Sequence, residues 1–198
     1  MPLIPPLSED DLDPELHDLV QFFQTTLGGV PNSVLTMARR PPMARAFVEL
    51  NKAVMTDYGA VTLEFKRLVG YVSSLSSGCM YCQAHMILAS ERFGASEERL
   101  NSVWQFETSD HFTEAEKAAL AFALAASTVP NAVDDAVMDR LRAHWSEDAI
   151  CELTGVVSLF GWLNRWNDTM GTPLEELPVS RGEMRLRETT GWTKGKHV

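Results

Sequence analysis

The stretch VTLEFKRLVGYVSSLSSGCMYCQAH, residues 61–85, is the part of the chain that decides the fold. Its first half spaces apolar side chains as an amphipathic helix does. These side chains are Val61, Phe65, Leu68, Val72 and Leu75. The stripe leads directly into two cysteines and a histidine, Cys79, Cys82 and His85. We predict a second helix from about Gly78 to Phe93, which carries both thiols near its N-terminus.

Helical periodicity extends outward from this stretch over most of the chain. Asp13-Pro14 is typical of a helix start, and Gly28 of a helix end. Thr113–Glu116 forms a capping box, and Ser146 caps a long helix that we predict to run to about Met170. No convincing run of alternating β-branched residues appears, so the sequence predicts an all-α fold.

The apolar pattern of the first stripe recurs over residues 150–160, which suggests two related helical halves that pack together. We therefore predict a single helical domain over residues 1–177. Its thiol-bearing half covers about residues 42–104, and its second half about residues 112–177. Residues 178–198 are polar and show no helical stripe, so they are expected to be a frayed tail or an arm that docks on a neighbouring subunit.

Charge, hydropathy and cysteine content argue against several classes of protein. Its 17 basic and 27 acidic side chains give a net charge of −10, which argues against a nucleic-acid partner. No apolar run approaches the ~20 residues of a membrane span. The N-terminus lacks the basic start and apolar core of a secretory signal, and three cysteines make no secreted disulfide framework. We expect a cytoplasmic protein that binds neither nucleic acid nor membrane.

The thiol pair has the chemistry of a redox site. Each helical residue turns by about 100°, so Cys82 and His85 lie about one turn apart on one face. The thiolate is the reactive form. The helix N-terminus favours a thiolate at Cys79, whereas hydrogen-bond reach to His85 favours Cys82, so the attacking sulfur stays open.

Two alternatives need no redox chemistry. Cysteines can pack as small buried hydrophobes, as we expect for the third one, Cys151. A zinc ion could instead be held by Cys79, Cys82 and His85, although structural zinc sites usually take a second ligand pair, which this sequence lacks.

The segment GCMYCQAH at residues 78–85 resembles the carboxymuconolactone decarboxylase superfamily, in its branch similar to alkyl hydroperoxidase D. Shorter matches occur in the family's order at residues 29–33, 40–41, 116–120 and 163–167. The resemblance implies an all-helical fold that assembles into dimers, trimers or hexamers. It also implies peroxide reduction without flavin, haem or metal, in which a thiolate becomes a sulfenic acid and then a disulfide. An outside thiol, such as a lipoyl-bearing protein, would reduce that disulfide.

The resemblance makes Cys82 the attacking thiol, Cys79 the resolving thiol and His85 the proton carrier. The histidine stands one residue earlier than in the better-known family pattern, and Arg67 stands where that pattern has a glutamate. The nearest acid on that helix is Glu64, which we take as the residue that orients His85.

We therefore expect a thiol-dependent peroxidase, a homo-oligomer that uses hydroperoxides, an external thiol or lipoyl-protein reductant and no cofactor. The alternatives are a redox sensor or zinc-binding interaction module without catalysis, and a decarboxylase of the carboxymuconolactone type. The cysteine pair counts against the decarboxylase, since those enzymes do not depend on it.

Overall fold

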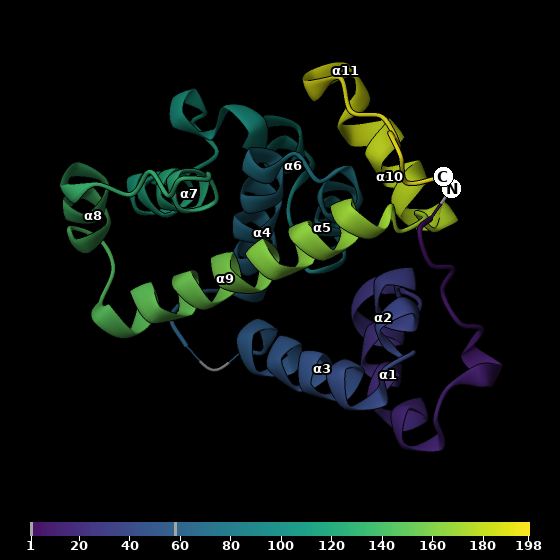
Figure 1. Cartoon of the computed structure of the whole chain (residues 1–198). Helices are drawn as coiled ribbons and strands as arrows, with labels where there is room; N and C mark the ends of the chain where they lie inside the picture. Colours follow the sequence, from purple (N-terminus) through teal and green to yellow (C-terminus); the bar gives the residue numbers. More distant parts are fainter. Residues whose placement is uncertain (1, 58) are drawn as a thin grey trace.

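The computed structural model describes residues 2–57 and 59–198, and every regular element in them is helical (Figure 1). The predicted all-α fold is confirmed. In chain order the elements are η1 (Glu9–Asp11), α1 (Pro14–Leu27), α2 (Asn32–Met37), α3 (Pro41–Met55), α4 (Leu63–Ser77), α5 (Met80–Arg92), α6 (Glu97–Ser102), η2 (Val103–Thr108), α7 (Glu114–Ala126), α8 (Asp135–Arg142), α9 (Glu147–Met170), α10 (Glu176–Arg185) and α11 (Arg187–Thr190). None of these described helices has the combined length and apolar character needed to cross a membrane.

The helix ends follow the capping residues of the sequence. The Asp13 side chain accepts a hydrogen bond from a free N–H at the start of α1, and Gly28 ends the helix in the left-handed region with φ 87°. At α7 both hydrogen bonds of the capping box between Thr113 and Glu116 are present. Ser146 caps α9, which ends at Met170. These predicted boundaries are confirmed.

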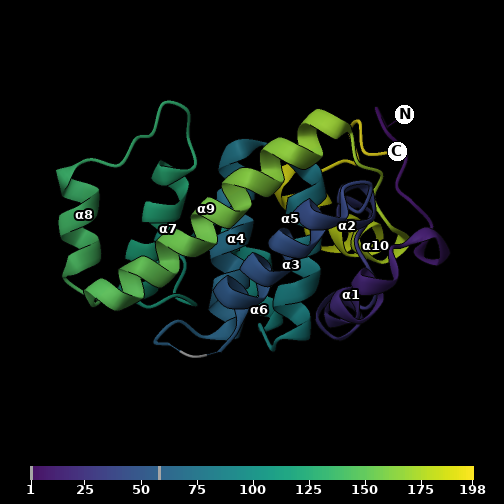
Figure 2. The same ribbon diagram turned by 60° about the horizontal axis from the view of Figure 1, so that its bottom comes forward.

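Helices α4 and α5 form the centre of the fold, and α9 crosses both of them (Figures 1 and 2). Gly78, with φ 73°, ends α4, so the chain reverses and α5 begins after Cys79. A Cβ atom at Gly70 would lie 2.6 Å from the Phe160 ring. The missing side chain lets α9 approach α4 closely, and the two predicted apolar stripes therefore face each other.

The remaining helices flank this centre at opposite ends of α9. Helices α1, α2 and α3 lie beside α5 and one end of α9, whereas α7 and α8 lie at the other end (Figure 2). α10 packs along α5 (Figure 1). The thiol helix is thus enclosed by α1, α4, α9 and α10, which come from widely separated parts of the sequence.

Residues 178–198, expected to be a frayed tail or an arm on a neighbouring subunit, lie against α5 of their own chain. Trp192 is 2% exposed, and its indole Nε1 donates to the main-chain oxygen of Met80 at 3.0 Å. A Cβ atom at Gly182 would lie 2.7 Å from the Trp192 ring, so α10 accommodates the indole at a glycine. Close contact at small residues, rather than an apolar stripe, holds α10 in place.

Candidate active site

The two thiols lie together at the start of α5. Cys79 is the N-cap residue and Cys82 follows in the first turn, so their side chains come within hydrogen-bond distance. Both cysteines are reduced and buried, with 0% and 3% of their surface exposed. Cys151, in contrast, is exposed, which corrects its expected burial, because it lies on the outer face of α9.

The hydrogen bond between the thiols makes them unequal. The Cys82 thiol donates to Cys79 and, against the effect of burial, lowers the pKa of Cys79 to about 6, with a further contribution from His197. Burial first, and then the interaction with Cys79, raise the pKa of Cys82 well above its ordinary value. The pair therefore holds one proton near neutral pH, on Cys82, and the negative charge is on Cys79.

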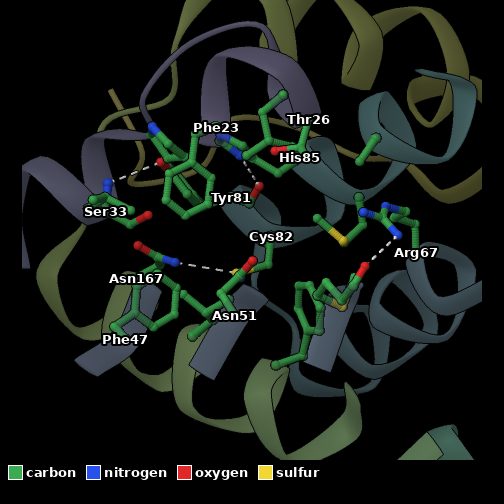
Figure 3. Close-up of a pocket in the computed structure, with 18 of the residues that line it drawn as sticks. Phe23, Thr26, Ser33, Phe47, Asn51, Arg67, Tyr81, Cys82, His85 and Asn167 are labelled. Carbon is green, nitrogen blue, oxygen red and sulfur yellow. Dashed lines mark hydrogen bonds between the residues drawn. The ribbon is translucent and has the colours of Figure 1, made fainter. Parts of the chain in front are cut away.

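Cys82, but not Cys79, lines a cavity of about 60 Å³ between α1, α3, α5 and α9 (Figure 3). This volume exceeds several-fold the ~10–15 Å³ that one water molecule needs. The wall is largely apolar and includes Phe22, Phe23, Phe47, Met55, Met86, Phe160 and Leu163. A small molecule in this cavity would therefore meet the Cys82 sulfur first.

Asn167, on α9, is a polar residue in direct contact with this sulfur. Its Nδ2 donates to Cys82 Sγ at 3.4 Å (Figure 3). The residue is 1% exposed, and its Oδ1 has no hydrogen-bond partner within residues 2–57 and 59–198. Asn167 was not among the predicted site residues, since nothing in its local sequence places it beside a thiol.

His85 also lines the cavity, and both of its ring nitrogens are engaged. Nδ1 lies 3.0 Å from the Tyr81 carbonyl oxygen, which can only accept, so Nδ1–H is the donor. Nε2 lies 3.0 Å from Glu175 Oε2. A nitrogen lone pair and a carboxylate repel at this distance, so a proton lies between them, as in an imidazolium–carboxylate ion pair.

The pKa shifts agree with this ion pair. Burial lowers the pKa of His85, but the charge and hydrogen bond of Glu175 outweigh it, and the net shift is upward. Burial likewise raises the pKa of Glu175, and its interactions with His85 and the main-chain N–H of Asn32 reverse the direction. Both shifts therefore favour the ionised form of the pair.

Neighbouring groups fix the Glu175 carboxylate, which precedes α10. Its Oε1 accepts from the Tyr81 hydroxyl at 2.9 Å and from the N–H of Asn32 at the start of α2. The Tyr81 hydroxyl in turn accepts from the Ser33 N–H at 3.2 Å. The Tyr81 ring stacks on the His85 ring with centroids 4.2 Å apart. The carboxylate and the imidazole are thus held rigidly.

Glu64 lies outside this group, which corrects its predicted position beside His85. Its carboxylate accepts from Arg99 Nε at 3.0 Å, and the same guanidinium donates to Glu116 at 2.7 Å. Glu64 therefore faces α6 and α7 rather than the cavity. The carboxylate that bonds to His85 is Glu175, which no local sequence pattern connects with the thiols.

Arg67 does not pair with Glu64 either. It donates to the Leu63 carbonyl at 2.7 Å, and its guanidinium carbon lies 3.6 Å from the Phe93 ring centroid. Burial lowers its pKa to about 10, which leaves it charged at neutral pH. Its side chain closes one side of the cavity (Figure 3).

The donors proposed for zinc do not converge. Among the described residues no group of three or more His, Cys, Asp and Glu side chains has a geometry that could hold a metal ion. The ring nitrogens of His85 are bonded to Tyr81 and Glu175 instead.

The chain is similar to known proteins in sequence and in fold. The model of the carboxymuconolactone decarboxylase family matches residues 41–125. The debrominase Bmp8, solved as a cysteine-to-alanine variant in complex with 2,3,4-tribromopyrrole, is 34% identical with a TM-score of 0.87. That superposition covers 92% of this chain and 96% of Bmp8. The chain belongs to the carboxymuconolactone decarboxylase family. The predicted superfamily is confirmed.

Two further proteins are similar to this chain. An uncharacterized peroxidase-related protein from Ralstonia eutropha JMP134, described as an alkylhydroperoxidase AhpD core, has a TM-score of 0.78 at 23% identity. The match covers 88% of this chain and 93% of that one, and it confirms the AhpD-like fold. The uncharacterized protein YnjA of Escherichia coli K12 is 36% identical over 100 residues, which are 50% of this chain and only 54% of YnjA.

Proposed function

We propose that the protein is a thiol-dependent peroxidase that reduces hydroperoxides through a dithiol–disulfide cycle of Cys79 and Cys82. The observation that carries the proposal is the position of the Cys82 sulfur, in the wall of an apolar cavity and hydrogen-bonded to a second thiol of low pKa. The first sulfur meets the substrate, and the second is close enough to form a disulfide with it.

In the first step the Cys82 sulfur attacks the hydrogen-bearing oxygen of the hydroperoxide. The O–O bond breaks, the sulfur becomes a sulfenic acid, and the thiol proton passes to the Cys79 thiolate along their hydrogen bond. The departing alkoxide takes a proton from the imidazolium of His85, which lines the same cavity. Glu175 keeps that imidazole charged and oriented before the reaction.

In the second step the Cys79 sulfur attacks the sulfur of the Cys82 sulfenic acid. The S–O bond breaks, and the leaving hydroxide combines with the Cys79 proton as water. An external dithiol, such as a lipoyl group, then reduces the disulfide and restores both thiols. No flavin, haem or metal takes part, and we expect the active form to be a cytoplasmic homo-oligomer.

The cavity favours a hydroperoxide with an apolar organic group. Its aromatic and methionine side chains would bury such a group. The amide of Asn167 lies at the sulfur, where the peroxide oxygens would be.

Peroxide consumption with dihydrolipoamide as reductant tests the proposal. We expect faster turnover of cumene hydroperoxide than of hydrogen peroxide, and a mass loss of two hydrogen atoms in the peptide containing both cysteines. A wild-type protein that consumes no peroxide with any dithiol, and forms no such disulfide, would overturn it.

A second candidate is reductive dehalogenation of a small aromatic ring, favoured by the 34% identity to a debrominase over 92% of this chain. In such a reaction the ring carbon is protonated, the bromine moves to the Cys82 sulfur, and the Cys79 sulfur displaces bromide to form the disulfide. Overall, an aryl bromide and two thiols give an arene, hydrogen bromide and a disulfide. Bromide release from 2,3,4-tribromopyrrole without peroxide turnover would favour this candidate over the peroxidase.

A further inference from the structure

Residues 192–198 form a strap that covers the start of α5. Trp192 donates to the Met80 carbonyl at 3.0 Å, and Leu174 N–H donates to the carbonyl oxygen of His197 at 3.2 Å. Lys196 forms an ion pair with Asp168 of α9 at 2.9 Å. These contacts hold the strap at its start and near its end.

The strap brings an imidazole to the buried thiol. His197 is 2% exposed and its side chain is hydrogen-bonded to Cys79, which is 0% exposed. The His197 ring centroid lies 5.8 Å from the ring centroid of Tyr81, a residue that stands between the two cysteines in the sequence. A side chain that the sequence leaves far from the thiols is thus part of their surroundings.

The tautomer of His197 follows from its other hydrogen bond. Nδ1 lies 2.9 Å from the Thr172 carbonyl oxygen, which can only accept, so Nδ1 carries a proton. The other ring nitrogen, Nε2, is therefore the one left for Cys79, and an imidazole nitrogen can donate a hydrogen bond to a thiolate or accept one from a thiol. The ring is therefore oriented to exchange a proton with this sulfur.

We propose that His197 is the catalytic base for Cys79, the imidazole that ionises the resolving thiol once Cys82 is oxidised. This assignment rests on the proposed peroxidase cycle for its place in the reaction. Nε2 takes the Cys79 proton, and the Cys79 sulfur bonds to the Cys82 sulfur as the S–O bond breaks. The same proton then passes from Nε2 to the leaving hydroxide, which departs as water and leaves a neutral imidazole.

His85 does not fill this role, because its nitrogens bond to Tyr81 and Glu175 and not to Cys79, whereas His197 bonds to Cys79. The need for a second base arises because oxidation removes the strongest partner of Cys79. The largest influence that lowers the pKa of Cys79 is the hydrogen bond from the Cys82 thiol, and a sulfenic acid at Cys82 has no such thiol. His197 lowers the pKa of Cys79 as well and remains in place.

The other titratable groups near Cys79 are known and can be separated from His197. Besides Cys82, they are His85 on α5, which interacts with Cys79, and Asp168 on α9, which interacts with Cys82. The Asp168 charge is partly balanced by Lys196. A variant that breaks this ion pair therefore tests the strap without changing the imidazole.

The test measures iodoacetamide alkylation of Cys79 against pH, with fragment masses separating Cys79 from Cys82. In His197→Gln and His197→Ala we expect the midpoint to move up from about 6 by about one pH unit. At pH values well below the midpoint, the alkylation rate then falls about tenfold. Imidazole added to His197→Ala restores part of the rate. His144→Gln, at an exposed histidine on the far side of the fold, leaves the midpoint unchanged, and Lys196→Ala changes it less than His197→Gln does.

A single peroxide turnover gives the second readout. In His197→Gln we expect the sulfenic acid at Cys82 to form at the wild-type rate and to persist, because disulfide formation slows. Unchanged alkylation and unchanged disulfide formation in folded His197 variants would overturn the assignment. If the wild type forms no sulfenic acid, the peroxidase proposal fails, while the alkylation midpoint still decides the role of His197.

If both His197 variants unfold, the wild-type protein decides. Nitrogen chemical shifts of the His197 ring are measured before and after Cys79 is capped with methyl methanethiosulfonate. A change at Nε2 supports the assignment, and an unchanged shift contradicts it.

Discussion

Glu175 Oε2 lies 3.0 Å from His85 Nε2, and this contact joins the thiol helix to the turn that precedes α10. The family model ends at residue 125, so the carboxylate comes from outside the region that identifies the family. The chain lacks the expected glutamate at Arg67, yet an acid still contacts the histidine. The pairing of imidazole and carboxylate is kept, with its acid drawn from a different part of the fold.

Replacement of this acid tests the pairing directly. In Glu175→Gln the charge that raises the pKa of His85 is lost, so burial dominates and the pKa of His85 falls. We expect peroxide turnover near pH 7 to fall about 100-fold, as for the loss of a general acid. Turnover kinetics and histidine NMR titration measure the two effects.

Glu64→Gln is the matched control, because this carboxylate bonds to Arg99 away from the cavity. It should keep the wild-type pKa of His85 and turnover within about twofold. Equal losses in both variants would contradict the assignment of Glu175.

The same ion pair makes stability depend on pH. The pKa of His85 is raised on folding, so its contribution is complete below the unfolded value of about 6.5 and disappears as pH rises through the folded value. The pKa of Glu175 is lowered, so its contribution is present above about 4.3 and disappears as pH falls through the folded value. The stability difference between wild type and Glu175→Gln, from urea unfolding, should peak between these limits. A difference that does not vary with pH would show that the pair is not ionised.

The two cysteines should give opposite results after a peroxide pulse. Cys79→Ser is expected to accumulate a sulfenic acid at Cys82, because no second thiol can resolve it. Cys82→Ser is expected to form none, because the remaining thiol does not line the cavity. Dimedone labelling followed by mass spectrometry distinguishes them. Labelling in Cys82→Ser alone would reverse the two roles.

Asn167 should affect the attacking sulfur more than the fold. Asn167→Leu keeps the volume but removes the N–H that lies 3.4 Å from Cys82 Sγ. We expect the rate of sulfenic acid formation to fall about tenfold, in line with one lost hydrogen bond to a developing charge. Stopped-flow measurement of the first turnover gives this rate. Asn164→Leu, at a neighbouring amide outside the cavity, is the control.

The strap depends on a glycine in α10. Gly182→Ala places a methyl group about 2.7 Å from the Trp192 ring, so the indole must move. We expect destabilisation by about 1–3 kcal/mol, as for an overpacked core, together with a shift in Trp192 fluorescence. Gly161→Ala is the control, since a Cβ there meets no atom within 4 Å. In the middle of α9 it should stabilise the fold by about 0.5–1 kcal/mol.

The fold was predictable because its signals are local. The stripe in residues 61–75, the capping box at Thr113 and the cap at Ser146 each lie within a few residues of the structure that they define. α10 escaped prediction because its contacts use Pro178 and Gly182, which are buried although they form no apolar stripe.

The site was predictable only as far as one helix extends. Cys79, Cys82 and His85 lie within about two turns of α5, so their spacing places them in the same part of one helix. The expected hydrogen bond from His85 to Cys82 is absent, because the ring nitrogens of His85 bond to Tyr81 and Glu175. Asn167, Glu175 and His197 reach them through tertiary packing, for which the sequence carries no local signal. Glu64 was predicted to orient His85 because it lies on the neighbouring helix. Its carboxylate instead bonds to Arg99 and faces away from the cavity.

The remote origin of these partners has a consequence for the newly made chain. Translation delivers Cys79 and Cys82 to the cell well before Glu175 and His197 exist. In a nascent polypeptide the thiols therefore keep an ordinary pKa of about 8.5, are mostly protonated at neutral pH and react slowly with oxidants. The contribution of His197 to the low pKa of Cys79 arises only when the end of the chain folds back onto α5, so the complete chain has the more acidic Cys79.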